Sequence, residues 1–128
     1  MPAHLIAPSL LSCDFLRLGE ETRMLENAQA DWLHLDVMDG NFVPNISFGL
    51  PIISAVKKIS TKPLDVHLMI VQPEKYIQAF RDAGADHISV HYEACTHLHR
   101  TVHQIHETGA KAGIAINPHT PVELLFDV

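Results

Sequence analysis

Short apolar runs typical of β-strands alternate along this chain with longer amphipathic stretches typical of helices. The strand-like runs begin about 23 to 32 residues apart, which is the length of one strand–helix unit. Repeated units of this kind predict a parallel sheet. We expect strands over Leu5–Ser9, Trp32–Val37, Leu64–Met69, His87–His91 and Ala112–Asn117, and helices over Phe15–Asn27, Leu50–Ile59, Pro73–Ala83 and Leu98–Glu107.

Two parallel architectures fit five such units, an open doubly wound sheet and a (βα)₈ barrel. The barrel is favoured because no glycine-rich nucleotide-binding loop follows the first strand and because one strand face is polar, as a lumen would be. Polar residues also recur at the C-terminal ends of four strands, where barrels place active sites: Ser9, His34 with Asp36, His67, and Ser89 or His91. We therefore expect an α/β fold that comprises about the first five units of a TIM barrel.

The length of the chain suits one domain. No linker or low-complexity segment divides its 128 residues, so residues 1–128 are expected to form a single domain or part of one. A complete barrel usually needs about 200 residues or more. The last residues, Glu123–Val128, resemble an unfinished helix, and the chain is therefore expected to be the N-terminal part of a longer barrel.

The charge balance narrows the possible partners. Nine basic and fifteen acidic residues give a net charge of −6, which argues against nucleic acid or an anionic membrane. A small anionic substrate stays open, since helix N-termini and backbone amides can hold phosphate. The apolar runs are too short to span a membrane and Met1–His4 lacks signal-peptide features, so the cytoplasm is expected. Cys13 and Cys95 are expected to be free thiols.

Two similar polar motifs lie on consecutive predicted strands. The first is His34-Leu35-Asp36-Val37-Met38 and the second is Asp65-Val66-His67-Leu68-Met69. Side chains alternate across a strand, so His34, Asp36 and Met38 share one face of the first strand, and His67 and Met69 share one face of the next. The apolar residues between them face a hydrophobic layer. The pattern predicts that two histidines and an aspartate converge on one place.

Imidazole and carboxylate together suit zinc, manganese, cobalt or ferrous iron. His34, Asp36 and His67 supply three ligands, which is the number that a catalytic metal site uses when it leaves a position open. Beside such a cation, Asp36 could exchange a proton with a substrate while the metal stabilises an enolate oxygen. Met38 and Met69 would add soft apolar walls. The set favours proton abstraction next to a carbonyl over hydrolysis, because no further base or nucleophile–base pair is evident.

Other polar residues carry weaker signals. Asp65 is interpreted as structural, and His87 is discounted because it starts its strand and would lie at the opposite end of a barrel. His91 and Glu93 lie at the end of the fourth predicted strand. That they reach the mouth of the site and that they do not are given equal weight. The helical histidines flank a buried apolar seam and are expected to be solvated: His99, His103 and His106.

Over essentially all 128 residues the chain resembles the ribulose-phosphate 3-epimerase family. The resemblance rests on Ile6–Ser12, on the long run Trp32–Asn45, and on Asp65–Met69, with further matches at Gly84–Asp86 and Ala115–Pro118. It implies a (βα)₈ barrel that interconverts D-ribulose 5-phosphate and D-xylulose 5-phosphate in the pentose phosphate pathway, through a cis-enediolate, with one divalent metal ion. Zinc is the first expectation for that ion, with Fe²⁺, Mn²⁺ and Co²⁺ also open.

The resemblance also implies individual roles. His34, Asp36 and His67 match metal ligands, and Asp36 matches one of two catalytic acid/base carboxylates. Ser9 matches a residue that contacts the substrate and orients that carboxylate. Met38 and Met69 match methionines around the enediolate, and His67 is expected to contact the substrate as well. These assignments predict a sugar phosphate as the small-molecule partner, in a homo-oligomer without nucleic-acid or membrane partners.

The chain departs from the family in length. The family's second catalytic aspartate, which is also its fourth metal ligand, and its glycine-rich phosphate loops are expected beyond these residues, so the 128-residue chain alone is expected to be inactive. Two alternatives stay open. One is a hexulose-phosphate 3-epimerase, and the other is a non-catalytic metal-binding fragment that pairs with itself through exposed sheet edges.

Overall fold

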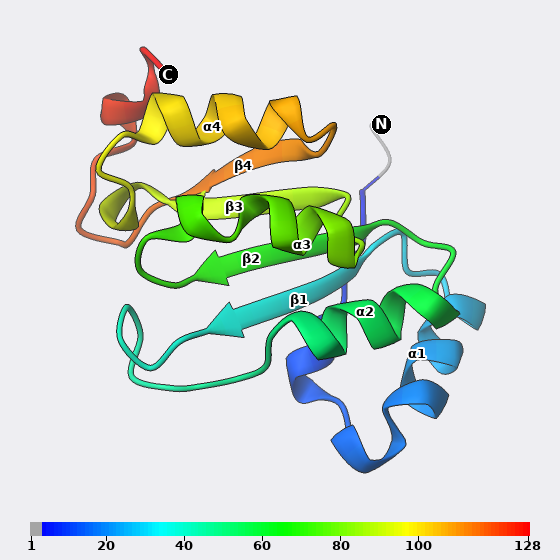
Figure 1. Cartoon of the computed structure of the whole chain (residues 1–128). Coiled ribbons are helices and arrows are strands. Elements are labelled where there is room, and N and C mark those ends of the chain that lie inside the picture. The colour runs from blue at the N-terminus through cyan, green and yellow to red at the C-terminus, as the bar shows by residue number, and fades with distance from the viewer. Residues whose placement is uncertain (1–3) are drawn as a thin grey trace.

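Four parallel strands form a single sheet in the computed structural model, which describes residues 4–128. They lie side by side in chain order (Figure 1): β1 (Leu33–Met38), β2 (Leu64–Met69), β3 (His87–His91) and β4 (Lys111–Ala115). A doubly wound sheet reverses its strand order, whereas a barrel keeps it sequential. The fold is therefore α/β and of the TIM-barrel type. The observation that Met1–His4 lacks signal-peptide features concerns mainly Met1, Pro2 and Ala3, which lie outside the described residues.

Helices connect the strands and cover one face of the sheet. Figure 1 shows α2, α3 and α4 on the same side of the strands, while α1 lies beyond the β1 edge. Within residues 4–128, no helix has both the length and the apolar character that crossing a membrane requires. The helices are α1 (Leu18–Asn27), α2 (Leu50–Ile59), α3 (Ile77–Ala83) and α4 (Leu98–Glu107), and short 3₁₀ turns occupy Leu10–Ser12, Phe15–Arg17, Pro73–Lys75, Tyr92–Ala94 and Val122–Leu125.

Strand alternation separates an apolar face from a polar one. In β1 and β2 every second residue is fully or almost fully buried and packs in the core with the helices. Each such aliphatic side chain contributes about 1.5–3 kcal/mol when removed from water. The intervening polar residues are half-buried on the opposite face. The buried set comprises Leu33, Leu35, Val37, Leu64, Val66 and Leu68 from the strands with Ile53, Val56, Ile77, Phe80 and Ile105 from the helices.

The prediction of a first strand over Leu5–Ser9 is wrong. This segment is extended and meets β1 only through an isolated bridge between Ser9 and His34. The Ile6 and Pro8 carbonyls accept hydrogen bonds from the chain at Asp31, Trp32 and His34. Pro8 has no N–H to donate in return, so a regular ladder cannot form there. The sheet consequently has four strands, and β1 is flanked by an extended segment.

The other boundaries differ by short distances. The predicted helix Phe15–Asn27 begins as a 3₁₀ turn, since the Asp14 side chain accepts a hydrogen bond from Leu16 N–H and Arg17 has a non-helical backbone. Pro73–Ala83 likewise divides at Tyr76 into a 3₁₀ turn and α3. β1 is displaced by one residue from the expected Trp32–Val37, and β4 ends at Ala115, two residues before the expected end. The predicted bounds of β2, β3, α2 and α4 are confirmed.

Glu26 fastens the end of α1 to the loop between α2 and β2. Its carboxylate accepts hydrogen bonds from the Ser60 and Thr61 hydroxyls and from the Thr61 and Lys62 N–H groups. Burial alone would raise the pKa of this carboxyl group, but the bonds from Ser60 and Thr61 outweigh it and lower the pKa to about 2. Glu26 therefore stabilises the folded chain in its ionised form.

Replacing Glu26 with glutamine should lower the free energy of unfolding at pH 7 by about 1 kcal/mol, a value reduced for solvent screening of a partly exposed group. Because the folded pKa lies below the ordinary value of 4.5, the contribution is complete above that pH and is lost as the pH falls towards 2. Urea unfolding of both proteins at pH 7 and near pH 2.5 measures it. The exposed Glu123→Gln is the control, and an equal difference at both pH values would contradict the prediction.

Candidate metal centre

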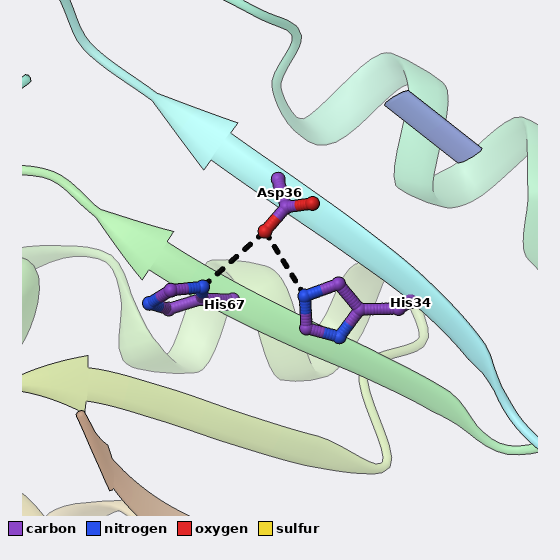
Figure 2. A group of neighbouring side chains, drawn as sticks. All are labelled: His34, Asp36 and His67. Atoms are coloured by element: carbon purple, nitrogen blue, oxygen red, sulfur yellow. Dashed lines mark hydrogen bonds and ion pairs between the residues drawn. The ribbon is translucent and has the colours of Figure 1, made fainter. Parts of the chain in front are cut away.

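Donor atoms of His34, Asp36 and His67 all lie within 4.8 Å of one another. Asp36 stands between the two rings (Figure 2), with its Oδ1 atom 3.0 Å from His34 Nε2 and 3.3 Å from His67 Nδ1. These side chains come from two strands whose register places Asp36 directly beside His67. The convergence that the two sequence motifs predict is thus present in the structure.

The local sequence explains why these side chains meet. Leu35 and Val37 are buried on the helix-covered face of β1, and Val66 is buried on the same face of β2. Because successive side chains point to opposite faces, burying these residues turns their polar neighbours to the other face. A shift of either strand by one residue would reverse both faces, so the apolar core fixes the register of the site.

Ser9 holds the outer side of the Asp36 carboxylate. Its hydroxyl donates to Asp36 Oδ2 at 2.7 Å, and the Ser9–His34 bridge fixes the backbone of that segment. Burial alone would raise the pKa of Asp36, but the Ser9 hydrogen bond and the charges and contacts of His34 and His67 together lower it. Asp36 is therefore ionised near neutral pH.

Asp65 holds the second nitrogen of His34. Its Oδ2 atom lies 2.8 Å from His34 Nδ1, and the sheet register pairs the two residues. This hydrogen bond is the main cause of a raised pKa at His34. Asp65 thus contacts one of the three clustered side chains, which is compatible with the structural role predicted for it. Its spacing of two residues from His67 was the sequence signal.

His91 lies next to His67, and Glu93 lies next to His91. The His91 and His67 Nε2 atoms are 2.8 Å apart, and His91 Nδ1 is 3.3 Å from Glu93 Oε1. The pKa of His67 is lowered, chiefly because the ring is buried. Burial alone would raise the pKa of Glu93, but hydrogen bonds from Thr120, Asn117 and His91 lower it. Of the two equally weighted predictions, the structure favours the one in which His91 reaches the site, and Glu93 is connected to it through His91.

Met38 and Met69 end their strands and are paired in the sheet register. They stand two residues beyond Asp36 and His67, so each continues the polar face of its strand towards the C-terminal edge. Met69 is buried and Met38 is half-buried. Their predicted role as soft apolar walls beside the cluster stays a prediction.

The remaining histidines do not join the cluster. His99, His103 and His106 are exposed on α4, as expected, and His103 pairs with Glu107 at 3.3 Å. His87 begins β3 and packs against Trp32 with ring centroids 4.1 Å apart. Cys13 and Cys95 are free, which confirms the thiol prediction. The cluster therefore draws on neighbouring strands only, with His34 as the second residue of β1 and Asp36 and His67 as the fourth residues of β1 and β2.

Cavity size does not identify this site. A cavity of about 370 Å³ is lined mainly by apolar residues of α2, α3 and the end of β2, among them Leu50, Ile70 and Phe80. None of the three clustered side chains lines it. The chemistry of the convergent donors, which the structure brings together from two strands, is the feature that distinguishes the site.

The donor set fits a divalent cation. Two imidazole nitrogens and one carboxylate oxygen are ligands that first-row metal ions accept, and three protein ligands leave positions for a substrate. Each imidazole has a partner on its second nitrogen, Asp65 for His34 and His91 for His67. Such partners orient metal-binding histidines in proteins. The residues present thus have the composition and the outer contacts of a metal centre.

Comparison with known proteins gives a consistent assignment. Residues 5–128 match the family model described as the Ribulose-phosphate 3 epimerase family. A ribulose-phosphate 3-epimerase of Bacillus subtilis is 57% identical over 123 residues, covering 96% of this chain and 57% of the relative. One of Synechocystis is 58% identical over 122 residues, covering 94% of this chain and 53% of the relative. The chloroplastic ribulose-5-phosphate-3-epimerase of Arabidopsis thaliana is 50% identical, with 94% and 44% covered. The chain spans about half the length of these curated relatives.

Proposed function

The chain belongs to the ribulose-phosphate 3-epimerase family, and we propose that the full natural protein containing it interconverts D-ribulose 5-phosphate and D-xylulose 5-phosphate. The observation that carries the proposal is the Asp36 carboxyl group, held between two imidazoles and a serine hydroxyl on the polar face of parallel strands. A fixed carboxylate beside a cation site is what removal of a proton next to a carbonyl requires.

His34 Nε2, Asp36 Oδ1 and His67 Nδ1 are the atoms proposed to hold a divalent cation, since these are the donors that converge. When bound, such a cation supplies Lewis-acid stabilisation of the negative charge that develops on a substrate oxygen. Zinc is proposed first, and Fe²⁺, Mn²⁺ and Co²⁺ suit the same donors. The lowered pKa of His67 favours the neutral ring that a metal ligand must have.

Asp36 is proposed to take the proton from C3 on its Oδ2 atom. This oxygen accepts one hydrogen bond from Ser9, which leaves it a second lone pair for the incoming proton. Loss of the proton leaves a cis-enediolate, and its return to the opposite face of C3 inverts the centre. That return needs a second acid on the other side of the substrate plane, which Asp36 cannot reach, so the proposal concerns the full protein.

The neighbouring side chains are proposed to shape the substrate site. Ser9 keeps Asp36 oriented and contacts the sugar, and His67 borders the sugar from β2. Met38 and Met69 form an apolar wall at the strand ends. Apolar, polarisable groups exclude water and lower the local dielectric constant, which strengthens electrostatic interactions with a developing anion.

An NMR assay in D₂O tests the proposed function. The product of the whole natural reading frame that contains these residues is incubated with D-ribulose 5-phosphate. We expect D-xylulose 5-phosphate to form with deuterium at C3, because the proton is removed and returned through groups that exchange with solvent. Faster turnover of a six-carbon ketose phosphate would favour the hexulose-phosphate alternative. A folded protein that converts neither would contradict the proposal.

A further inference from the structure

His91 is a buried imidazole whose two nitrogens both face polar partners. It ends β3 and is 7% exposed. One nitrogen, Nε2, lies 2.8 Å from His67 Nε2, and the other, Nδ1, lies 3.3 Å from Glu93 Oε1. Buried polar groups need such partners, because a buried donor or acceptor that is left unsatisfied destabilises the folded chain. These contacts connect Glu93, through His91, to the side of His67 that points away from Asp36.

Only one arrangement of protons satisfies this chain of contacts while His67 binds a cation. A cation held by His67 Nδ1 leaves the ring proton on Nε2, which must donate to His91 Nε2. His91 Nε2 then carries a lone pair, so the proton of the neutral His91 ring is on Nδ1. That proton faces the Glu93 carboxylate, which is an acceptor. In the series His67–His91–Glu93, every N–H donor then meets an acceptor.

The surroundings hold His91 and Glu93 in place. Phe42 packs against the His91 ring with centroids 4.8 Å apart, and the His67 and His91 ring planes differ by 20°. Glu93 accepts hydrogen bonds from Asn117 N–H and from the Thr120 hydroxyl, both at 3.0 Å. His91 and Glu93 are thus fixed by three segments: the loop after β1, the end of β3 and the loop after β4.

We propose that His91 and Glu93 are positioning residues, which fix the ring orientation and the tautomer of His67 so that its Nδ1 atom faces the cation. This inference rests on the metal site of the proposed function. Within residues 4–128, the Nε2 atom of His67 meets an imidazole rather than a carboxylate, whereas the Nδ1 atom of His34 meets Asp65 Oδ2 at 2.8 Å. Asp65 offers His34 a carboxylate acceptor directly. Glu93 plays the equivalent part for His67 through the intervening His91 ring.

Metal affinity of single variants tests the proposal without relying on turnover. In competition with a chromophoric chelator, His91→Leu in the full protein should weaken Zn²⁺ binding by about 10- to 100-fold, the usual effect of losing such a partner. His91→Gln should recover most of the affinity, because its amide offers an acceptor to His67 and a donor to Glu93. The matched control, His99→Leu on the exposed face of α4, should bind Zn²⁺ like the unmodified protein.

A second measurement needs no substitution and so does not depend on how a variant folds. In the Zn²⁺-loaded protein, ¹⁵N-detected imidazole correlations should place the His91 proton on Nδ1 and the His67 proton on Nε2. A His91 proton on Nε2, or unchanged Zn²⁺ affinity in His91→Leu, would overturn the positioning role and leave the epimerase proposal standing. Zn²⁺ binding and these tautomers in a protein without epimerase activity would instead overturn the proposed function alone. Absence of Zn²⁺ binding by the unmodified protein would overturn both.

Discussion

Exchange of the C3 proton of D-ribulose 5-phosphate with solvent should fall by about 10²- to 10⁴-fold, the usual contribution of a general base, when Asp36 is replaced by asparagine in the full protein. The amide keeps the shape of the side chain and can still accept the Ser9 hydrogen bond through its oxygen. It cannot accept the substrate proton. The rate of deuterium incorporation at C3, followed by ¹H NMR in D₂O, measures the effect.

The same substitution removes a carboxylate that is also a proposed cation ligand, so the effects on proton transfer and on cation binding must be separated. Zn²⁺ content is measured in each sample, and exchange is compared at saturating Zn²⁺, where a loss of affinity alone would be compensated. Asp82→Asn makes the same chemical change on the exposed surface of α3 and should exchange at the normal rate. Near-normal exchange in Asp36→Asn at equal metal occupancy would refute the assignment of Asp36 as the base.

The cluster was predictable because it depends on a local rule and on one pairing. Alternation puts His34 and Asp36 on one face of a strand whatever the rest of the fold does. The buried residues Leu35 and Val66 then orient both strands on the same core. Consecutive βα units usually place their strands side by side, so the second motif was expected next to the first. The alternation, the buried residues and the order of the strands can all be recognised in short stretches of sequence.

The outer contacts of the cluster were not predictable in the same way. His91 meets His67 because β3 pairs with β2 in one particular register, which places Ser89 beside His67. Glu93 is held by Asn117 and Thr120, which lie beyond another helix and strand. Such contacts depend on the packing of three segments that the local pattern does not relate to one another. The sequence therefore indicated that His91 and Glu93 were candidates without deciding whether they reach the site.

The errors in the fold have a similar origin. Leu5–Ser9 has the apolar character of a strand, but Pro8 lacks the N–H that a ladder needs. The predicted end of β4 was too late because Asn117 N–H turns to the Glu93 side chain and leaves the sheet. By contrast, the observed bounds of β2 and α2 coincide with those that the apolar periodicity predicts. Periodicity thus located the elements, whereas individual hydrogen bonds fixed the ends that were missed.

Replacing His67 with alanine should weaken Zn²⁺ binding by more than about 100-fold, because loss of a ligand exceeds the loss caused by removing a ligand's partner. It removes the Nδ1 donor beside Asp36 and leaves His91 Nε2 without its contact at 2.8 Å. His34→Ala should have an effect of the same order, since it removes the other imidazole donor. Competition with a chromophoric chelator measures both affinities, with His103→Ala on the exposed face of α4 as the matched control.

The comparison of the two ligand variants decides whether the cation is held by the convergent atoms. If both imidazoles bind one ion, His34→Ala and His67→Ala should each lower its affinity, and the double variant should bind no more tightly than the weaker single one. Two independent weak sites would instead leave half of the bound Zn²⁺ in either single variant. Unchanged Zn²⁺ affinity in both variants would contradict the proposed site. Tight binding would then need ligands other than the two imidazoles, since the one carboxylate of Asp36 does not hold Zn²⁺ tightly by itself.

Removal of Zn²⁺ by a chelator should also slow C3 proton exchange, and addition of Zn²⁺ should restore it.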